Sequence, residues 1–395
     1  MSSPLSAHEK LVLKIEQNLV NAGKLPIRLL QLAAYFPYHI RNNGRLNAKS
    51  SCQPLVLWSL VCLLASVWSL TTFYIHIEYF KLTRTEFATD NVVQKTISVI
   101  FLIYHKHLML FAIIRARRFA KFWSKLTSVV SSVVGDSSSD HAIFLEEIEQ
   151  LRVRTRIGAL VVLFVPIGSH LTNVLVLGQH SNDLWKWEQR SEMFTRIILA
   201  LTSAVWVQET YLHGALALWL SYLVRVQVVC LRMISHRLAR ALEVSPRDQL
   251  VSILSKSVTD FEHVEGLSRE FNELYDHLLL LDFCFNGILS TYFAYLVPTV
   301  VFEGNYTAVM VSLMSICIIG HRLHNLCSAC SSYLMATAEV QQNLLKLRTV
   351  APSVEPGVGE QVIVIIYIIT NGNSGSYTIL RTFNAYFKIF LRWTS

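Results

Sequence analysis

The chain is poor in charged residues. Only 16% of its 395 residues are Asp, Glu, Lys or Arg, whereas 52% are hydrophobic. A soluble protein of this length carries more charge, because its surface faces water. The apolar residues fall in blocks of about 20, which is long enough for a helix to cross a bilayer. The scarcity of charge argues against an ordinary soluble domain and predicts an all-α membrane protein.

Catalytic motifs are also missing. The sequence has no phosphate-binding loop, no His-Glu-x-x-His and no Gly-x-Ser-x-Gly. We therefore expect neither an enzyme nor a bound cofactor. The formal net charge is +8, but the basic residues lie mostly between apolar blocks, as in membrane proteins. We expect no nucleic-acid partner.

The N-terminal segment shows no cleavable signal peptide. It is polar and basic, and the first apolar block starts near Pro54. We expect the first span to act as an uncleaved anchor.

The seven cysteines form no evident disulfide framework. Cys327 and Cys330 form a Cys-x-x-Cys pair, and His321 and His324 precede it at the same three-residue step. Four such ligands suit zinc. On one straight helix, however, this step spirals around the axis, so the four side chains cannot converge. Reduced thiols and unligated imidazoles are the favoured interpretation, and no metal site is predicted.

Hydropathy predicts about seven spans. The first six are expected at 54–77, 92–114, 157–179, 195–224, 277–302 and 307–328, and the seventh lies within 361–391. The seventh is interrupted by the polar stretch 371–376. The chain thus divides into a cytoplasmic N-terminal segment (1–53), a six-span bundle with cytoplasmic helical loops (54–350) and the interrupted last span (351–395).

The orientation follows from the lysines and arginines. Most lie in the N-terminal segment and in the second, fourth and sixth loops. The opposite loops hold only Lys81, Arg84, Lys186 and Arg190, with Lys95 and Arg196 at span boundaries. Because positive charge stays on the cytoplasmic side, the N-terminus is predicted to be cytoplasmic and the C-terminus outside. This topology is inverted relative to a G-protein-coupled receptor.

One glycosylation sequon agrees with this orientation. Asn305 begins the only Asn-x-Ser/Thr sequence, in the fifth loop, which the topology places outside.

The cytoplasmic connections have helical periodicity. Phe144 to Arg154, Val229 to Ala241 and Val258 to Tyr275 are predicted to extend the spans as helices that pack together. The Ser-rich stretch from Ser131 to Asp140 is predicted to be a mobile loop.

Polar residues inside spans are the candidate binding residues, because they are costly in lipid. Asp282, with Asn286 on the same face, is expected to be structural. The remaining polar residues and nearby aromatics predict a small-molecule pocket in the outer half of the bundle. Its candidates are Glu209, Trp206, His170, Asn173, Tyr104, Tyr292 and Tyr295. The alternative is that these groups only hold helices together by hydrogen bonds. Lys106 also needs a partner or water in its span, and Glu209 is one candidate; the alternative is that this span is set closer to the membrane interface.

Several segments resemble the insect-type gustatory and odorant chemoreceptors. Residues 264–281 are similar to the family's helix entering the fifth span, and 327–347 to the extension of its sixth. Leu29 to Pro37 resembles the entry helix of gustatory members. Together with span spacing and length, these segments favour a gustatory receptor over an odorant receptor.

The resemblance implies a ligand-gated non-selective cation channel. It would detect a small-molecule tastant in the plasma membrane of a sensory neuron, as a homo- or hetero-tetramer surrounded by lipid. The family's last span lines the pore, so Tyr377, Ile379, Leu380 and Phe383 become pore candidates. This segment departs from the gustatory pattern, since Thr382 stands where the family has Gln and Arg381 intrudes. The alternatives are an odorant receptor of the same superfamily, a G-protein-coupled or other seven-span receptor, and a non-conducting member of the family.

Overall fold

The computed structural model describes the chain in separate stretches. They are residues 7–32, 39–40, 46–47, 88–135, 138–184, 192–244, 247–302 and 306–350, with isolated positions between 57 and 67. The interrupted seventh span, its pore candidates Tyr377, Ile379, Leu380 and Phe383, and the sequon at Asn305 lie outside the described residues.

Six long helices make up nearly all of the described part of the chain. They are α1 (Ala7–Leu32), α3 (Ala88–Val134), α4 (Ser138–Leu184), α5 (Glu192–Val244), α6 (Arg247–Phe302) and α7 (Tyr306–Val350). Two short strands, β1 (His39–Ile40) and β2 (Leu46–Asn47), pair antiparallel. The all-α prediction is confirmed for the described residues, with this strand pair as a small exception.

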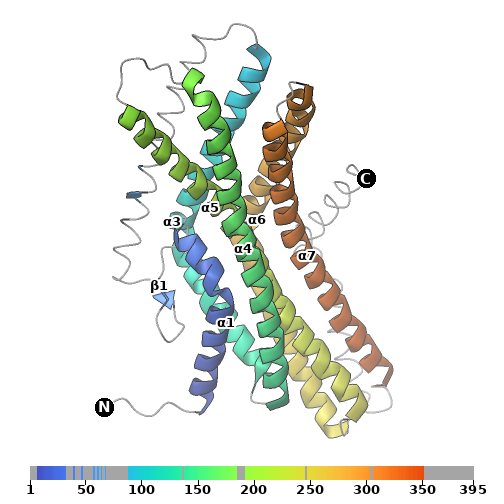
Figure 1. Ribbon diagram of the computed structural model, residues 1–395. Helices are drawn as coiled ribbons and strands as arrows, with labels where there is room; N and C mark the ends of the chain where they lie inside the picture. Colours follow the sequence, from blue (N-terminus) through green and yellow to red (C-terminus); the bar gives the residue numbers. More distant parts are fainter. Residues whose placement is uncertain are drawn as a thin grey trace, which may run out of the picture.

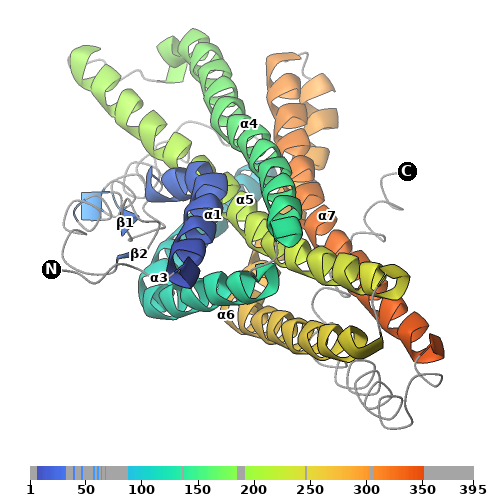
Figure 2. The ribbon, with the colours of Figure 1, turned by 90° about the horizontal axis from the view of Figure 1, so that it is seen from below.

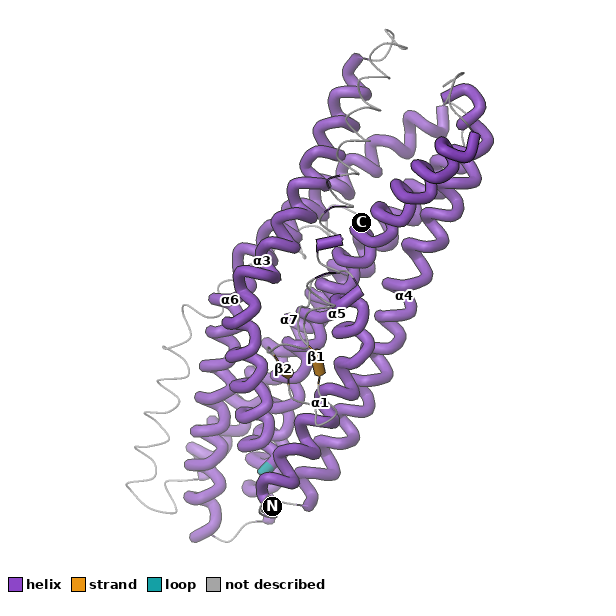
Figure 3. Tube along the Cα trace, turned by 90° about the vertical axis from the view of Figure 1, so that its left-hand side faces the viewer, coloured by secondary structure: helices purple, strands orange, loops and turns teal. Residues whose placement is uncertain are grey.

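The helices α3 to α7 run up and down along one axis (Figures 1 and 3). Each of the five predicted spans from 92–114 to 307–328 falls inside one helix, which then continues well beyond it. Two described segments, Gly214–Glu243 and Ser252–Pro298, are long and apolar enough to cross a membrane by length and composition. The predicted extensions, Phe144 to Arg154, Val229 to Ala241 and Val258 to Tyr275, lie within α4, α5 and α6 and are confirmed as helix.

The core forms around α5. This helix packs against α1, α3, α4, α6 and α7, and Figure 2 shows it passing through the middle of the bundle. Its side chains from Gly214 to Val224 are all buried. Trp219 stacks on both Trp123 of α3 and Tyr222, with ring centroids 5.7 and 5.4 Å apart. A helix that is apolar on every side is buried, either in a protein core such as this one or in a membrane.

The helix α6 shows why sequence periodicity identified its buried face. The apolar positions predicted at helical spacing are all at most 5% exposed: Phe261, Val264, Leu267, Phe271, Leu274 and Tyr275. Residues three and four apart share one side of a helix, so this stripe faces the rest of the bundle.

The helix α1 docks on the lower half of the bundle (Figure 1). Ile15, Leu19, Ile27 and Leu30 of α1 are fully buried. The Tyr222 hydroxyl donates a 2.7 Å hydrogen bond to the Leu19 carbonyl. A Cβ at Gly23 would lie 3.0 Å from the Tyr222 ring, so this close approach requires the small residue.

The prediction of a mobile loop from Ser131 to Asp140 is wrong. α3 continues to Val134, and α4 already begins at Ser138. Gly135 makes the turn with φ of 57°, in the left-handed region that favours glycine. Its N–H donates to the Ser131 carbonyl at 3.1 Å. The serine-rich sequence favours a solvated loop, but contacts with α5 and α6 keep most of this stretch helical.

Those contacts converge on Arg237 of α5. Its Nη1 lies 2.7 Å from Asp260 Oδ2 of α6, and its Nε lies 3.5 Å from Asp140 Oδ2 of α4. Its Nη2 donates to the Val133 carbonyl near the end of α3. Ser132 donates to the other oxygen of Asp260 at 2.9 Å. One guanidinium thus joins the ends of four helices.

Candidate functional site

A buried polar cluster links α3, α6 and α7. The Tyr104 hydroxyl of α3 donates a 2.7 Å hydrogen bond to Asp282 Oδ1 of α6. Arg322 Nη2 of α7 lies 3.2 Å from the same oxygen. The three residues are 6%, 4% and 8% exposed, so they face neighbouring helices. We call them the Tyr104–Asp282–Arg322 cluster.

Aromatic and amide groups complete this cluster. Phe285, one turn beyond Asp282, stacks on the Tyr104 ring with centroids 4.4 Å apart and planes 11° from parallel. Asn286 is fully buried, and its Nδ2 donates to the Asp282 carbonyl. These contacts agree with the structural role predicted for Asp282. The stacked ring holds the Tyr104 hydroxyl on the carboxylate.

Two buried polar atoms of this region have no partner within the described residues. They are Asn286 Oδ1, an acceptor, and Arg322 Nε, a donor. Buried polar atoms without partners cost free energy. The cluster therefore keeps hydrogen-bonding capacity that a rearrangement of the helices or a small polar molecule could use.

The structure describes the side chains of only some of the candidate ligand residues. Glu209 and Trp206 lie in α5, and His170 and Asn173 in α4, but their side chains are outside the described set, as is that of Lys106. Tyr104 is described, and it joins a polar cluster that includes Asp282.

The two α6 tyrosines lie apart from that cluster. Tyr292 is half-buried and Tyr295 is 55% exposed. Tyr292 is ten positions beyond Asp282, which is about 15 Å along a helix. The structure thus brings Tyr104 to Asp282 but places Tyr292 and Tyr295 further along α6.

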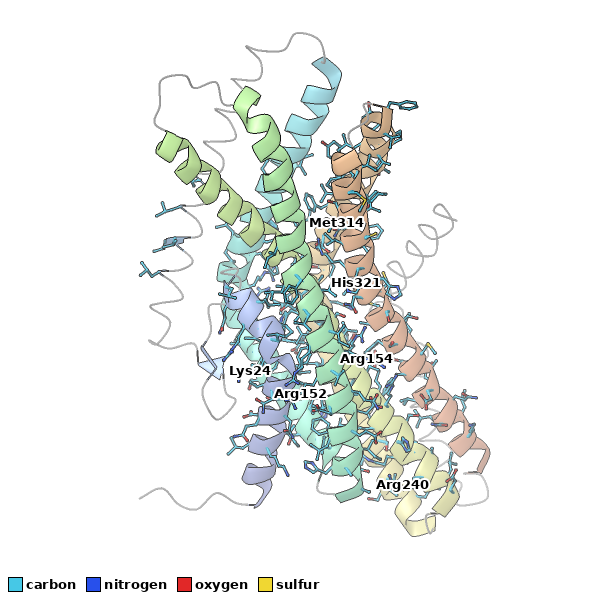
Figure 4. All side chains as sticks on the ribbon, viewed as in Figure 1. Lys24, Arg152, Arg154, Arg240, Met314 and His321 are labelled. Carbon is cyan, nitrogen blue, oxygen red and sulfur yellow. The ribbon has the colours of Figure 1, made fainter. Side chains whose placement is uncertain are left out.

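Sequence reasoning missed Arg322. It is a lone arginine inside the apolar run 307–328, and an ionisable residue at such a position is a functional candidate by default. Figure 4 shows its neighbour His321 on α7, below Met314. The charge could have been noticed, but its partner Asp282 could not.

The Cys-x-x-Cys segment of α7 is divided between two faces. Cys327 and Cys330 are buried, whereas His321 and His324 are exposed. The four side chains therefore do not converge. Among the described residues, no cluster of His, Cys, Asp and Glu could hold a metal ion.

The comparisons with known proteins find similarity in structure but not in sequence. No protein family matches the sequence, and no curated protein matches it. Among solved structures, the insect olfactory receptor OR5 from Machilis hrabei is similar, with a TM-score of 0.62 at 12% identity. The match covers 86% of this chain and 87% of that chain. The chain therefore has the fold of an insect olfactory receptor.

Proposed function

We propose that this chain is a chemosensory receptor of the gustatory type, forming a ligand-gated non-selective cation channel. The observation that carries the proposal is its shared fold with an insect olfactory receptor over 86% of the chain. Segments 264–281 and 327–347 resemble chemoreceptors in sequence, which supports the proposal independently of the fold. The protein would lie in the plasma membrane of a sensory neuron, as a homo- or hetero-tetramer.

The proposed topology has seven spans and a cytoplasmic N-terminus. The ends of α3, α5 and α7 meet the starts of α4 and α6 at the lower end of Figure 1. Arg152, Arg154 and Arg240 lie in that lower half (Figure 4). Positive charge at this end supports its cytoplasmic placement. Asn305, in the connection at the other end, would be the glycosylated residue.

In the proposed mechanism, a small tastant binds the open state better than the closed state and so shifts the equilibrium. Tyr104 would be a ligand contact, together with Glu209, Trp206, His170, Asn173, Tyr292 and Tyr295. Because Tyr104 also bonds Asp282, a ligand that moves this ring would disturb the contact between α3, α6 and α7. The pore would be lined by Tyr377, Ile379, Leu380 and Phe383.

Electrophysiology tests the proposal directly. The chain, alone and with related subunits, would be expressed in cells that lack such receptors, and a panel of tastants applied during whole-cell recording. We expect a cation current that persists when G proteins are blocked. A current abolished by that block would favour a G-protein-coupled receptor instead.

An odorant receptor is the second candidate, favoured by the identity of the matching structure. Volatile ligands would evoke the current in that case, and tastants would not. An epitope tag before Met1 tests the topology of both. Antibody access only after permeabilisation is expected, and access on intact cells would exclude the proposed orientation.

A further inference from the structure

Two arginines without carboxylate partners meet where α4, α5 and α7 pack. Arg225 Nη2 of α5 donates a 3.1 Å hydrogen bond to Asn325 Oδ1 of α7. One turn earlier, Ser221 Oγ donates to the Asn325 carbonyl at 3.2 Å. On α4, a Cβ at Gly158 would lie 3.7 Å from Asn325 Nδ2. The three helices therefore approach one another at Asn325.

Arg154 of α4 lies close to this approach of the three helices at Asn325. It lies four residues before Gly158, on the same side of α4. Figure 4 shows Arg154 on the side of α4 turned towards α7, and Arg152 on the side turned towards α1. The Arg154 and Arg225 charges are close enough to repel each other.

Nothing in the described part of the chain neutralises this pair. The exposed Arg154 forms no hydrogen bond or ion pair with the described residues, and Arg225 Nε is buried without a partner among them. Arg152, by contrast, pairs with Glu149 at 3.0 Å. Arg232, two turns beyond Arg225, likewise pairs with Glu147 at 3.0 Å.

The helices α5 and α7 offer no other carboxylate nearby. Between Glu209 and Glu243, α5 has none, and α7 has only Glu339. Glu339 accepts a 2.9 Å hydrogen bond from Ser235 and lies about 21 Å along the helix from Asn325. Since two adjacent guanidinium groups repel, a counter-charge from outside the described chain would stabilise them.

The position indicates where that charge comes from. The predicted spans begin at 157 and end at 224 and 328, so Arg154, Arg225 and Asn325 lie at the cytoplasmic boundary of the bilayer. Basic pockets between helices at this level bind acidic lipid head groups. Arginine suits phosphate because its planar guanidinium donates two parallel hydrogen bonds.

We propose that Arg154 and Arg225, with Asn325 positioning Arg225, bind a phosphate group of an acidic phospholipid in the cytoplasmic leaflet. We call this the Arg154–Arg225 site. It requires the membrane location but neither a tastant nor channel activity, so it can fail or succeed independently of the proposed function.

The test uses the full chain in phosphatidylcholine nanodiscs with added phosphatidylinositol bisphosphate, and native mass spectrometry to measure bound lipid. Arg154→Gln and Arg225→Gln are each expected to weaken binding by about fivefold or more. Arg156→Gln is the matched control, because Arg156 is an exposed arginine of the same helix on another face. It should change binding by less than about twofold.

The outcomes separate the alternatives. An equal loss in all three variants would mean diffuse attraction to a basic surface and would overturn the site, as would unchanged binding in Arg154→Gln. Arg154 is exposed, so this variant is expected to fold normally even if Arg225→Gln does not. Soluble inositol trisphosphate, added to plain phosphatidylcholine nanodiscs, should bind far more weakly. Equally tight binding would keep the phosphate site but overturn its assignment to lipid.

Discussion

Tyr104 and Asp282 are 178 residues apart in the chain, yet the Tyr104 hydroxyl lies 2.7 Å from Asp282 Oδ1. Arg322 approaches the same oxygen at 3.2 Å. One carboxylate oxygen thus joins three helices. This arrangement predicts how substitutions at each of these three positions affect the stability of the protein.

Asp282→Ala should destabilise the protein strongly. It leaves Arg322 buried without its carboxylate, and breaking a buried ion pair in this way costs about 3–5 kcal/mol. Thermal unfolding of the detergent-solubilised protein, followed by tryptophan fluorescence, measures the loss. The double variant Asp282→Ala/Arg322→Met removes both charges and should recover much of the stability. No recovery would show that the pair is not the source of the loss.

Tyr104→Phe should have a smaller effect. The phenylalanine keeps the stack on Phe285 but loses one hydrogen bond to a charged group, worth about 1.5–3 kcal/mol. If Tyr104 is also a ligand contact, the half-maximal tastant concentration should shift as well. Tyr295→Phe is the comparison for stability, since that side chain is 55% exposed; a similar loss of stability there would count against the Tyr104 bond.

Arg237→Gln should loosen the lower end of the bundle. Arg237 is the ion-pair partner of Asp260, whose side chain is 2% exposed, so its loss leaves a buried carboxylate without its counter-charge at a cost of about 3 kcal/mol. Hydrogen exchange should increase around Gly135 and at the start of α4. Arg240→Gln is the matched change, because Arg240 lies 3.6 Å from Asp140 but is 44% exposed. We expect almost no effect there, and equal effects would contradict this account.

Gly135→Ala and Gly266→Ala should act in opposite directions. Gly135 has φ of 57°, where a side chain costs about 1–2 kcal/mol. Gly266 is inside α6, and a Cβ there meets nothing within 4 Å. Alanine at 266 should therefore stabilise by about 0.5–1 kcal/mol. The unfolding temperatures of the two variants test this prediction. A shift of the same sign in both variants would contradict it.

His141 should make stability depend on pH. Burial, and secondarily the charge of Lys14, lowers the pKa of His141 below its ordinary value of 6.5. The folded protein then binds fewer protons at this site than the unfolded chain, so stability is highest above pH 6.5 and falls as the pH drops below it. Unfolding temperatures measured on both sides of this pH should show the decline. His141→Phe should flatten it, and an unchanged slope would assign the effect to other groups.

Local sequence patterns predicted most of the fold. The apolar stripe from Phe261 to Tyr275 indicated the buried face of α6, and each of the five predicted spans from 92–114 to 307–328 falls within a described helix. Helical periodicity depends on residues three and four positions apart, so it can be recognised from a short stretch of sequence. The same local reasoning failed at Ser131 to Asp140, where distant contacts with Arg237 and Asp260 shorten the loop.

The sequence alone determined that the chain is helical and which side of α6 is buried, because both depend on residue spacing and solvent preference. Only the tertiary structure decided which polar residues meet. Nothing in the local pattern around Arg322 identifies Asp282 as its partner, and nothing near Arg154 indicates Arg225. Such pairings depend on how whole helices cross, and this geometry is set by the packing of side chains along their entire length.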